Sequence, residues 1–290
     1  MSKIAIVTDS NSGILPSEAR QMEGVFVIPM PVFIGNDTFF EGIDISQQRF
    51  YEVLSTRTDL RTSQPSVADV SDFWDKILQD YDEIVHIPMS SGLSGSCSSA
   101  LMIAEDYDNK VHVVNNQRIS VTQRRSVYDA VILRESGRTG EQIREFLENV
   151  KFESSIYIML DTLYYLKRGG RITPAAAAIG TALKIKPVLT IQGEKLDAFT
   201  VARTVTIARN KMIDAIRKDM NERFGGDDPD NIHLDIAYTY NEQVAYDFKA
   251  QVEEAFPGYD DIVVAPLSLS VSCHIGPGSL AIACSRKIRP

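Results

Sequence analysis

The chain has 290 residues, of which 44% are hydrophobic and 24% are charged, the composition of an ordinary globular protein. Its formal net charge of −9 argues against non-specific nucleic-acid binding and against an anionic membrane surface. Cys97, Cys273 and Cys284 are never spaced as C-x-x-C, so we expect neither a disulfide framework nor a zinc site. A short apolar amino-terminal run does not suit a signal peptide, and we expect a cytoplasmic location.

Short apolar strands alternate with helical patterns in the first half of the chain. This alternation predicts a mostly parallel sheet with helices on both faces. Ligands of such sheets bind at the carboxyl ends of the strands, where Asp9-Ser10 and Ser90-Ser91 stand. The expected strands are 4–8, 25–28, 83–88 and 111–115, and the expected helices are 47–56, 66–79, 96–106, 118–136 and 140–150.

The second half is patterned differently, and we place a domain boundary near residue 150. The two domains are then 1–150 and 151–290, and a cleft between them is a natural ligand site. The expected strands are 155–160, 187–191, 232–238, 262–266 and 279–284, and the expected helices are 161–168, 174–183, 203–223 and 241–255.

Residues 262–285 carry no Asp, Glu, Lys or Arg. Proline and glycine interrupt this stretch, so we interpret it as a buried strand–loop–strand and not as a membrane helix.

Two clusters of small hydroxyls stand where helices are expected to begin, at Thr62-Ser63-Gln64-Pro65 and at 90–95 (SSGLSG). The first turn of a helix has unpaired N–H groups and a partial positive charge, so it attracts anions. Neither cluster has a lysine, which favours a carboxylate over a triphosphate. Helix capping alone, or a tight turn, remains the alternative explanation for both clusters.

The second cluster also nearly matches the G-x-S-x-G nucleophile elbow, with Ser96 in the place of the last glycine. A lipid or ester hydrolase with Ser94 as nucleophile and His274 as base is therefore a competing hypothesis. No Asp or Glu can be assigned to complete that triad, which weakens the hypothesis.

Three cations follow one another closely at Lys167, Arg168 and Arg171. Gly169-Gly170 is expected to end a helix, and cations at a helix carboxyl end are favoured by its dipole. Arg171 lies beyond that end, where a guanidinium group suits an anion or phosphoryl transfer.

His274 is one of only 4 histidines and precedes a Gly-Pro-Gly turn in an apolar region. A structural role is one interpretation, and a hydrogen bond from the imidazole to a ligand carboxylate is the other.

Taken together, these segments resemble the DegV family of fatty-acid-binding proteins, which includes the lipid-carrying subunit of bacterial fatty acid kinase. The resemblance implies an α/β fold with two lobes: a parallel Rossmann-like three-layer α/β/α lobe and a second lobe with a mixed sheet and helices. A fatty acid would lie between the lobes. The matching segments are IAIVTDSNSGILP at 4–16, TSQPS at 62–66, SSGLSG at 90–95, LDTLYYLKRGGRI at 160–172, IKPVLTI at 185–191 and SCHIGPGSLAIAC at 272–284.

The resemblance also implies a function without catalysis by this chain alone. The ligand would be a palmitate-like fatty acid, held without any cofactor or metal. The partner would be a separate ATP-binding kinase subunit that forms an acyl phosphate, with no nucleic acid and no stable membrane insertion. Arg171 would assist phosphoryl transfer. The carboxylate ligands would be Thr62, Ser94 and His274, with Ser63 and Ser91 as helpers.

The chain departs from the family pattern at 96–99 (SCSS) and at 115–123 (NNQRISVTQ). Arg124 and Arg125 also stand where the family has small or apolar residues. We expect these changes around one end of the lipid cavity, where they would affect the acyl length and shape that the cavity accepts.

Overall fold

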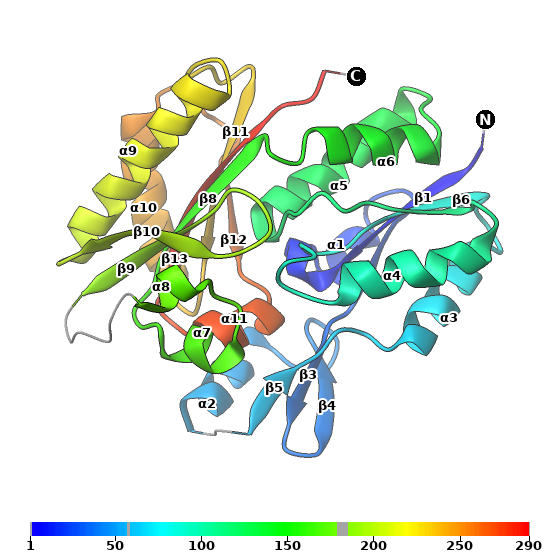
Figure 1. Ribbon diagram of the computed structural model, residues 1–290, viewed down its shortest axis with the longest axis horizontal. Helices are drawn as coiled ribbons and strands as arrows, with labels where there is room; N and C mark the ends of the chain where they lie inside the picture. Colours follow the sequence, from blue (N-terminus) through cyan, green and yellow to red (C-terminus); the bar gives the residue numbers. More distant parts are fainter. Residues whose placement is uncertain (1, 57–58, 179–184, 290) are drawn as a thin grey trace. The chain divides into compact units, whose positions relative to one another are not determined.

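The computed structural model describes residues 2–56, 59–178 and 185–289 (Figure 1). These residues form two compact units, of which unit 1 ends at Phe152 and unit 2 is Glu153–Arg289. Each unit has its own sheet and its own hydrophobic core.

The main sheet of unit 1 has four strands, all parallel, in the order β2-β1-β6-β7. They are β1 (Ile4–Asp9), β2 (Val25–Ile28), β6 (Glu83–Ile87) and β7 (Val111–Val113). The chain passes from β1 first to β2 on one side and later to β6 on the other. The strand order therefore reverses between β1 and β6, which is where sheets of this kind bind ligands.

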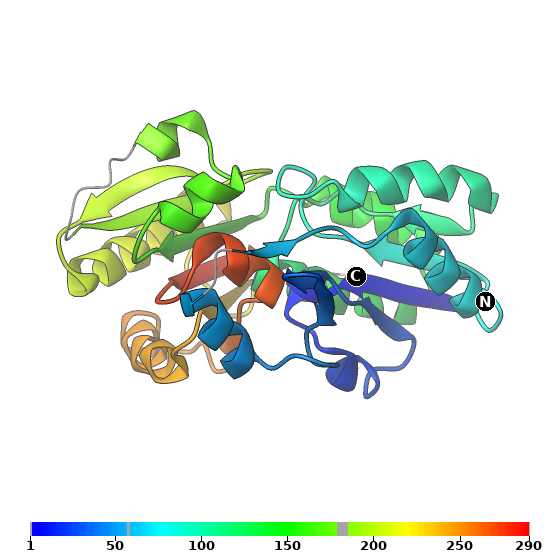
Figure 2. The same ribbon diagram turned by 90° about the horizontal axis from the view of Figure 1, so that it is seen from below.

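Helices cover both faces of this sheet, as predicted (Figures 1 and 2). Alternate strand residues such as Val7 and Ile84 join one core cluster with α3 (Val67–Ile77) and α4 (Ser96–Ala104). His112 points to the other face, where it meets Glu141 of α6. The remaining helices of this unit are α1 (Pro16–Ala19), α2 (Gln47–Thr56), α5 (Ser120–Glu135) and α6 (Gly140–Asn149), with short 3-10 turns η1 (Ser10–Ser12) and η2 (Glu105–Tyr107).

Unit 1 has a second, antiparallel sheet of three strands in the order β4-β3-β5, which the sequence patterns did not predict. Its strands are β3 (Pro31–Ile34), β4 (Asp37–Phe40) and β5 (Leu60–Thr62). Gly35, with a φ of 63°, makes the tight turn between β3 and β4. Thr62 consequently ends a strand, where it pairs with Val32.

Helix α3 begins with a capping box at Ser66. The Ser66 Oγ accepts from the Asp69 N–H at 3.1 Å, and the Asp69 carboxylate accepts from the Ser66 N–H at 3.3 Å. The helix therefore starts at Val67, and Ser66 is its cap. The capping explanation offered for the hydroxyls of 62–66 is confirmed at Ser66, whereas Thr62 ends β5 and does not cap α3.

Unit 2 is built on a six-stranded mixed sheet in the order β10-β9-β8-β13-β11-β12. Neighbouring strands are antiparallel except for β11 and β12. The strands are β8 (Ser154–Met159), β9 (Lys186–Ile191), β10 (Asp197–Ala202), β11 (Ile232–Tyr238), β12 (Val263–Pro266) and β13 (Leu280–Arg286), and of these β10 was not predicted.

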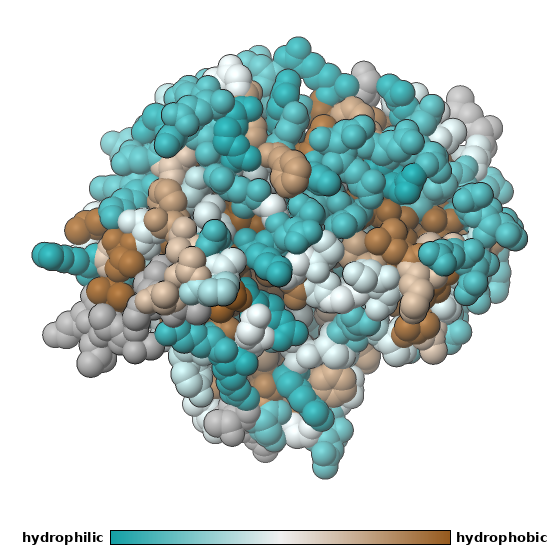
Figure 3. Space-filling model, viewed as in Figure 1, coloured by the Kyte–Doolittle hydropathy of each residue, from teal (hydrophilic) through white to brown (hydrophobic). Residues whose placement is uncertain are grey.

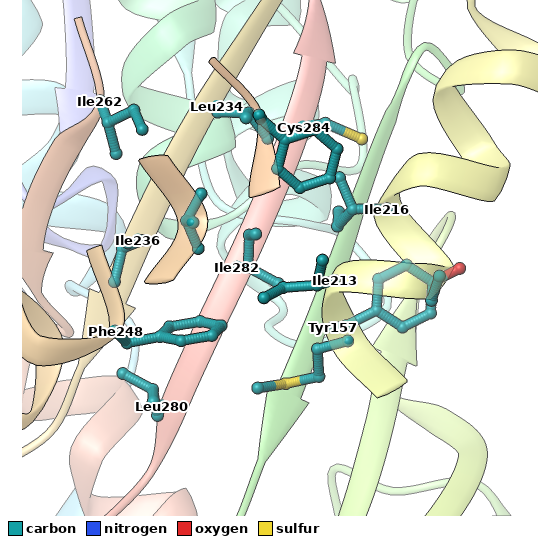
Figure 4. Packing of buried hydrophobic residues seen from close by; sticks show 14 of the residues in the cluster. Tyr157, Ile213, Ile216, Leu234, Ile236, Phe248, Ile262, Leu280, Ile282 and Cys284 are labelled. Atoms are coloured by element: carbon teal, nitrogen blue, oxygen red, sulfur yellow. The ribbon is translucent and has the colours of Figure 1, made fainter. Parts of the chain in front are cut away.

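Two long helices, α9 (Val205–Arg223) and α10 (Glu242–Ala255), supply the other half of the unit 2 core. Figure 4 shows Ile213 and Ile216 of α9 beside Ile282 of β13, with Phe248 of α10 next to them. These side chains are almost fully buried, so burial of apolar area holds the helices to the sheet.

The described part of unit 2 also has three short helices: α7 (Tyr164–Gly169), α8 (Pro174–Ala178) and α11 (Leu269–Ile275). The last corrects the strand–loop–strand interpretation of 262–285. Ser268 caps α11 by accepting from the Val271 N–H at 3.2 Å, and Leu269 and Ile275 are buried. A helix this short has too few turns for its apolar period to stand out in the sequence. The end of the helix predicted at 174–183 lies outside the described residues.

The surface is of an ordinary kind. The face shown in Figure 3 is mostly hydrophilic, with hydrophobic atoms in small separate groups. Among the residues that the structure describes, no helix combines the length and apolar composition that a membrane crossing needs.

Candidate functional site

A buried carboxylate braces the carboxyl ends of β1 and β6. Asp9 Oδ2 accepts from the Met89 N–H at 2.8 Å, and Oδ1 accepts from the Asn11 N–H at 3.0 Å and from Gln123 Nε2 at 3.2 Å. Burial raises the pKa of the Asp9 carboxyl, while these hydrogen bonds act to lower it. Asp9 thus fixes the loop that carries Ser90 and Ser91 against the end of β1.

Gln123 of α5 strengthens the same corner. Its Nε2 also lies 3.1 Å from Thr8 Oγ1 and 3.1 Å from the Ile87 carbonyl oxygen. Sequence reasoning missed this residue, because a lone glutamine in a helix gives no signal of such a role.

The second hydroxyl cluster stands at the first turn of α4. Ser94 Oγ accepts from the Ser96 N–H at 3.1 Å and lies 2.9 Å from Ser96 Oγ. It thereby satisfies one of the N–H groups left open at the helix start. Ser91 Oγ is buried and has no hydrogen-bond partner among the described residues. A buried hydroxyl without a partner is costly, so it offers a donor to a ligand oxygen.

The first hydroxyl cluster is tied to the second through Gln64. Gln64 Nε2 donates to Ser99 Oγ of α4 at 2.8 Å, and Ser63 Oγ donates to the Gln64 carbonyl oxygen at 2.8 Å. A Cβ on residue 95 would lie 2.6 Å from Gln64 Oε1, so Gly95 leaves room for this contact. The structure therefore brings the two clusters together within unit 1.

A narrow hollow lies beside these clusters, between α3, α4 and the sheet. The space free of atoms is about 320 Å³, open solvent included, and the room inside is that of about one water molecule. Pro65, Ser96 and Ser99 line it next to the hydroxyl clusters, and its apolar lining includes Ile28, Val70 and Ile103.

The family departures differ in their relation to this hollow. Ser96 and Ser99 of the SCSS segment line it. Arg124 is instead engaged elsewhere: its guanidinium group forms an ion pair with Glu18 at 2.7 Å and donates to the Gly13 carbonyl oxygen. Arg124 therefore has polar partners within unit 1.

In unit 2, His274 lies in the last turn of α11 and packs against α7. A Cβ on residue 169 would lie 2.5 Å from His274 Nδ1. Only glycine at position 169 allows this close approach without displacing the imidazole ring. Sequence reasoning assigned Gly169 to the helix end and did not foresee its contact with His274.

Arg171 and His274 belong to the same local electrostatic environment. Burial, together with the positive charge of Arg171, lowers the pKa of His274 to about 4. The imidazole is therefore neutral near pH 7. Arg171 is exposed and donates a hydrogen bond to the Gly169 carbonyl oxygen.

Two cations lie at the carboxyl end of a helix, as predicted. Lys167 and Arg168 stand in the last turn of α7, and Gly170 ends it with a φ of 70°. Burial raises the pKa of the neighbouring Cys273 thiol to about 11, so the thiol stays protonated despite Arg168 and Arg171.

The predicted site residues thus form two groups. Thr62, Ser63, Ser91 and Ser94 belong to unit 1, and Arg171 and His274 belong to unit 2. In the described part of the chain, no three His, Cys, Asp or Glu side chains gather as a metal site would require.

Comparison with known proteins identifies the DegV family, which the sequence resembles, over almost the whole chain. The model of the DegV family, described as uncharacterised, matches residues 3–287. Protein DegV of Bacillus subtilis is 29% identical over 282 residues, which cover 96% of this chain and 98% of that protein.

Solved structures show the same fold. A fatty-acid-binding DegV family protein from Thermus thermophilus is 28% identical, covers 98% of this chain and 100% of its own, and superposes with a TM-score of 0.88. DegV of Bacillus subtilis, described as a fatty acid binding protein, is 26% identical, covers 99% and 100%, and gives a TM-score of 0.85. The chain therefore belongs to the DegV family.

Proposed function

We propose that this chain binds a long-chain fatty acid through its carboxylate and presents it to a separate ATP-dependent kinase subunit. One observation carries the proposal: hydroxyl donors and an apolar hollow adjoin one another in unit 1. Pro65 of the first cluster lines the hollow, and so does Ser96, whose Oγ lies 2.9 Å from Ser94 Oγ of the second cluster. Two structurally similar proteins of the family are described as binding fatty acids.

The head group would be held by neutral donors. Hydroxyls and a neutral imidazole hold a carboxylate by hydrogen bonds without the tight ion pair that a lysine or arginine would make. One carboxylate oxygen then keeps its nucleophilic character. The ligands in this proposal are Thr62, Ser94 and His274, with Ser63 and Ser91 as helpers.

The acyl chain would enter the apolar hollow between α3 and α4. Burial contributes about 0.8 kcal/mol per CH₂, so a palmitate-like chain of about 16 carbons contributes on the order of 10 kcal/mol before ordering costs. The hollow has room for about one water molecule, so the side chains of α3 and α4 must move apart to admit it. That rearrangement reduces the net affinity.

Phosphoryl transfer would need the kinase subunit, because this chain would only position the nucleophile, the carboxylate of the bound fatty acid. The carboxylate oxygen attacks the γ-phosphorus of ATP on the kinase subunit, ADP leaves, and an acyl phosphate forms. Arg171 would offset the charge on the transferred group. Exposed Lys167 and Arg168 would help to dock the partner. The proposed location is the cytoplasm, where such a partner would have ATP.

Lipid extraction tests this proposal. Protein purified from cells should release about one equivalent of fatty acid on denaturation, detected by mass spectrometry. The delipidated protein should then rebind palmitate. Folded protein that carries no fatty acid and does not bind palmitate would contradict it.

The hydrolase hypothesis makes a different prediction for the same material. A serine hydrolase would turn over nitrophenyl esters without a partner and would be labelled by a fluorophosphonate at Ser94. The carrier proposal predicts neither result.

A further inference from the structure

A buried histidine faces the hollow without satisfying its hydrogen-bonding capacity. His86 of β6 is 3% exposed and lines the hollow. Its Nδ1 is buried and has no hydrogen-bond partner among the described residues. A ring nitrogen buried without a hydrogen bond lowers the stability of the folded protein.

Trp74, which packs against His86, also has a buried nitrogen without a hydrogen bond to the described residues. The Trp74 ring lies edge-on to the His86 ring, with centroids 5.4 Å apart. Trp74 is fully buried, and its Nε1 also lacks a hydrogen-bond partner in the part of the chain that the structure describes. The core cluster to which Trp74 belongs otherwise consists of hydrocarbon side chains and Cys97.

The other polar groups of the hollow already have partners. Asp9 accepts from backbone N–H groups and from Gln123, and Ser99 accepts from Gln64. Ser96 Oγ lies 2.9 Å from Ser94 Oγ. Among the described residues that line the hollow, His86 therefore has a buried polar atom, Nδ1, without a hydrogen-bond partner.

We propose that the hollow selects fatty acids whose chain carries a hydroxyl group, and that His86 is the residue that recognises it. This inference rests on the proposed function. A neutral imidazole has one donor nitrogen and one acceptor nitrogen, and a hydroxyl can pair with either of them.

The shape of the hollow places the hydroxyl in the part of the chain near the carboxylate. Its lining on α4 runs from Ser96 to Ile103, which is about 10 Å at about 1.5 Å per residue. The same lining begins beside Ser94 of the head-group cluster. A hydroxyl at the far end of a long chain lies beyond that length.

Competition binding to the delipidated full chain tests the proposal. Palmitate and hexadecanoic acids that carry one hydroxyl at different carbons displace a fluorescent fatty acid. We expect one positional isomer with the hydroxyl near the carboxylate to bind about five- to tenfold more tightly than palmitate, the value of one well-formed hydrogen bond.

Variants assign the preference to His86. In H86F the ratio of the two affinities should fall to about one, because the ring keeps its bulk and loses its nitrogens. H86N retains a polar group near the Nδ1 position and should keep most of the preference. H112F is the matched control, because His112 is a buried histidine on the other face of the same sheet.

Each outcome decides a specific point. Equal affinity of palmitate and every hydroxy acid for the wild-type protein overturns the inference and leaves the fatty-acid proposal standing. Binding of no acid at all overturns both. A preference that survives in H86F, with the variant folded by circular dichroism, shows that another group recognises the hydroxyl and also overturns the inference.

Discussion

The side-chain amide of Gln64 donates a 2.8 Å hydrogen bond to the hydroxyl of Ser99, and so connects the segment after β5 to the first turns of α4. The two residues are 35 positions apart in the chain. Through this bond the two hydroxyl clusters of unit 1 keep a fixed relation to each other.

Breaking this bond should weaken both the fold and the site. Gln64→Leu leaves Ser99 without its donor and should lower the free energy of unfolding by about 1 kcal/mol. Palmitate affinity should fall as well, because the segment that carries Thr62 loses an anchor. Gln48→Leu is the control, since Gln48 is paired with Glu52 on an exposed helix face. Equal palmitate affinity of both variants would show that the connection is not needed for binding. Urea unfolding and competition binding give the two readouts.

Ser91 separates ligand binding from stability. Its buried hydroxyl has no partner among the described residues, so Ser91→Ala should not reduce the stability of the ligand-free protein. The same substitution should weaken palmitate binding by about 1 kcal/mol if the hydroxyl donates to the carboxylate. Thermal unfolding with and without palmitate measures both quantities. A loss of stability without palmitate, with binding unchanged, would mean that Ser91 has a structural role only.

Gly169 tests the placement of His274. A methyl group at this position would press on Nδ1, so Gly169→Ala should destabilise the protein by about 1–3 kcal/mol through overpacking. Removing the imidazole in the double variant G169A/H274A should recover part of that loss but not the palmitate affinity. A double variant as unstable as G169A alone would contradict the contact.

The buried histidines predict how stability depends on pH. Burial lowers the pKa of His86 from its ordinary 6.5 to about 3 in the folded protein. Between these values the unfolded chain binds a proton that the folded chain does not. The free energy of unfolding therefore decreases as the pH falls below 6.5.

The contribution of His86 is at most about 1.4 kcal/mol per pH unit in this window. H86F, measured by urea unfolding at pH 6.5, 5.5 and 4.5, should lose less stability on acidification than the wild-type protein. Parallel stability profiles for the two proteins would show that His86 does not supply this dependence.

The sequence predicted the parts of the fold that repeat a clear pattern. Buried parallel strands such as 4–8, long helices such as 203–223 and the glycine end of α7 follow from apolar runs, period and capping chemistry. The sheet formed by β3, β4 and β5 was missed because its strands have only three or four residues and are half exposed. The Gly35-Asn36 turn between two apolar runs was the signal available for the β3–β4 hairpin.

The candidate site was predictable only in part for a similar reason. Hydroxyls at helix starts have a chemical meaning that a sequence reveals. Gln64, Gln123 and His86 act through contacts with residues distant in the chain, which only the folded structure brings together. Helix α11, which carries His274, was interpreted as a loop because its seven residues are too few to establish a helical period.

The central claim is that neutral donors hold a carboxylate, and binding of palmitate beside its methyl ester tests it most directly. The two ligands share one hydrocarbon tail and differ at the head group. The account predicts that delipidated protein binds palmitate at least about tenfold more tightly than methyl palmitate, and that Thr62→Val reduces this difference. Equal affinity for the acid and the ester would contradict the account.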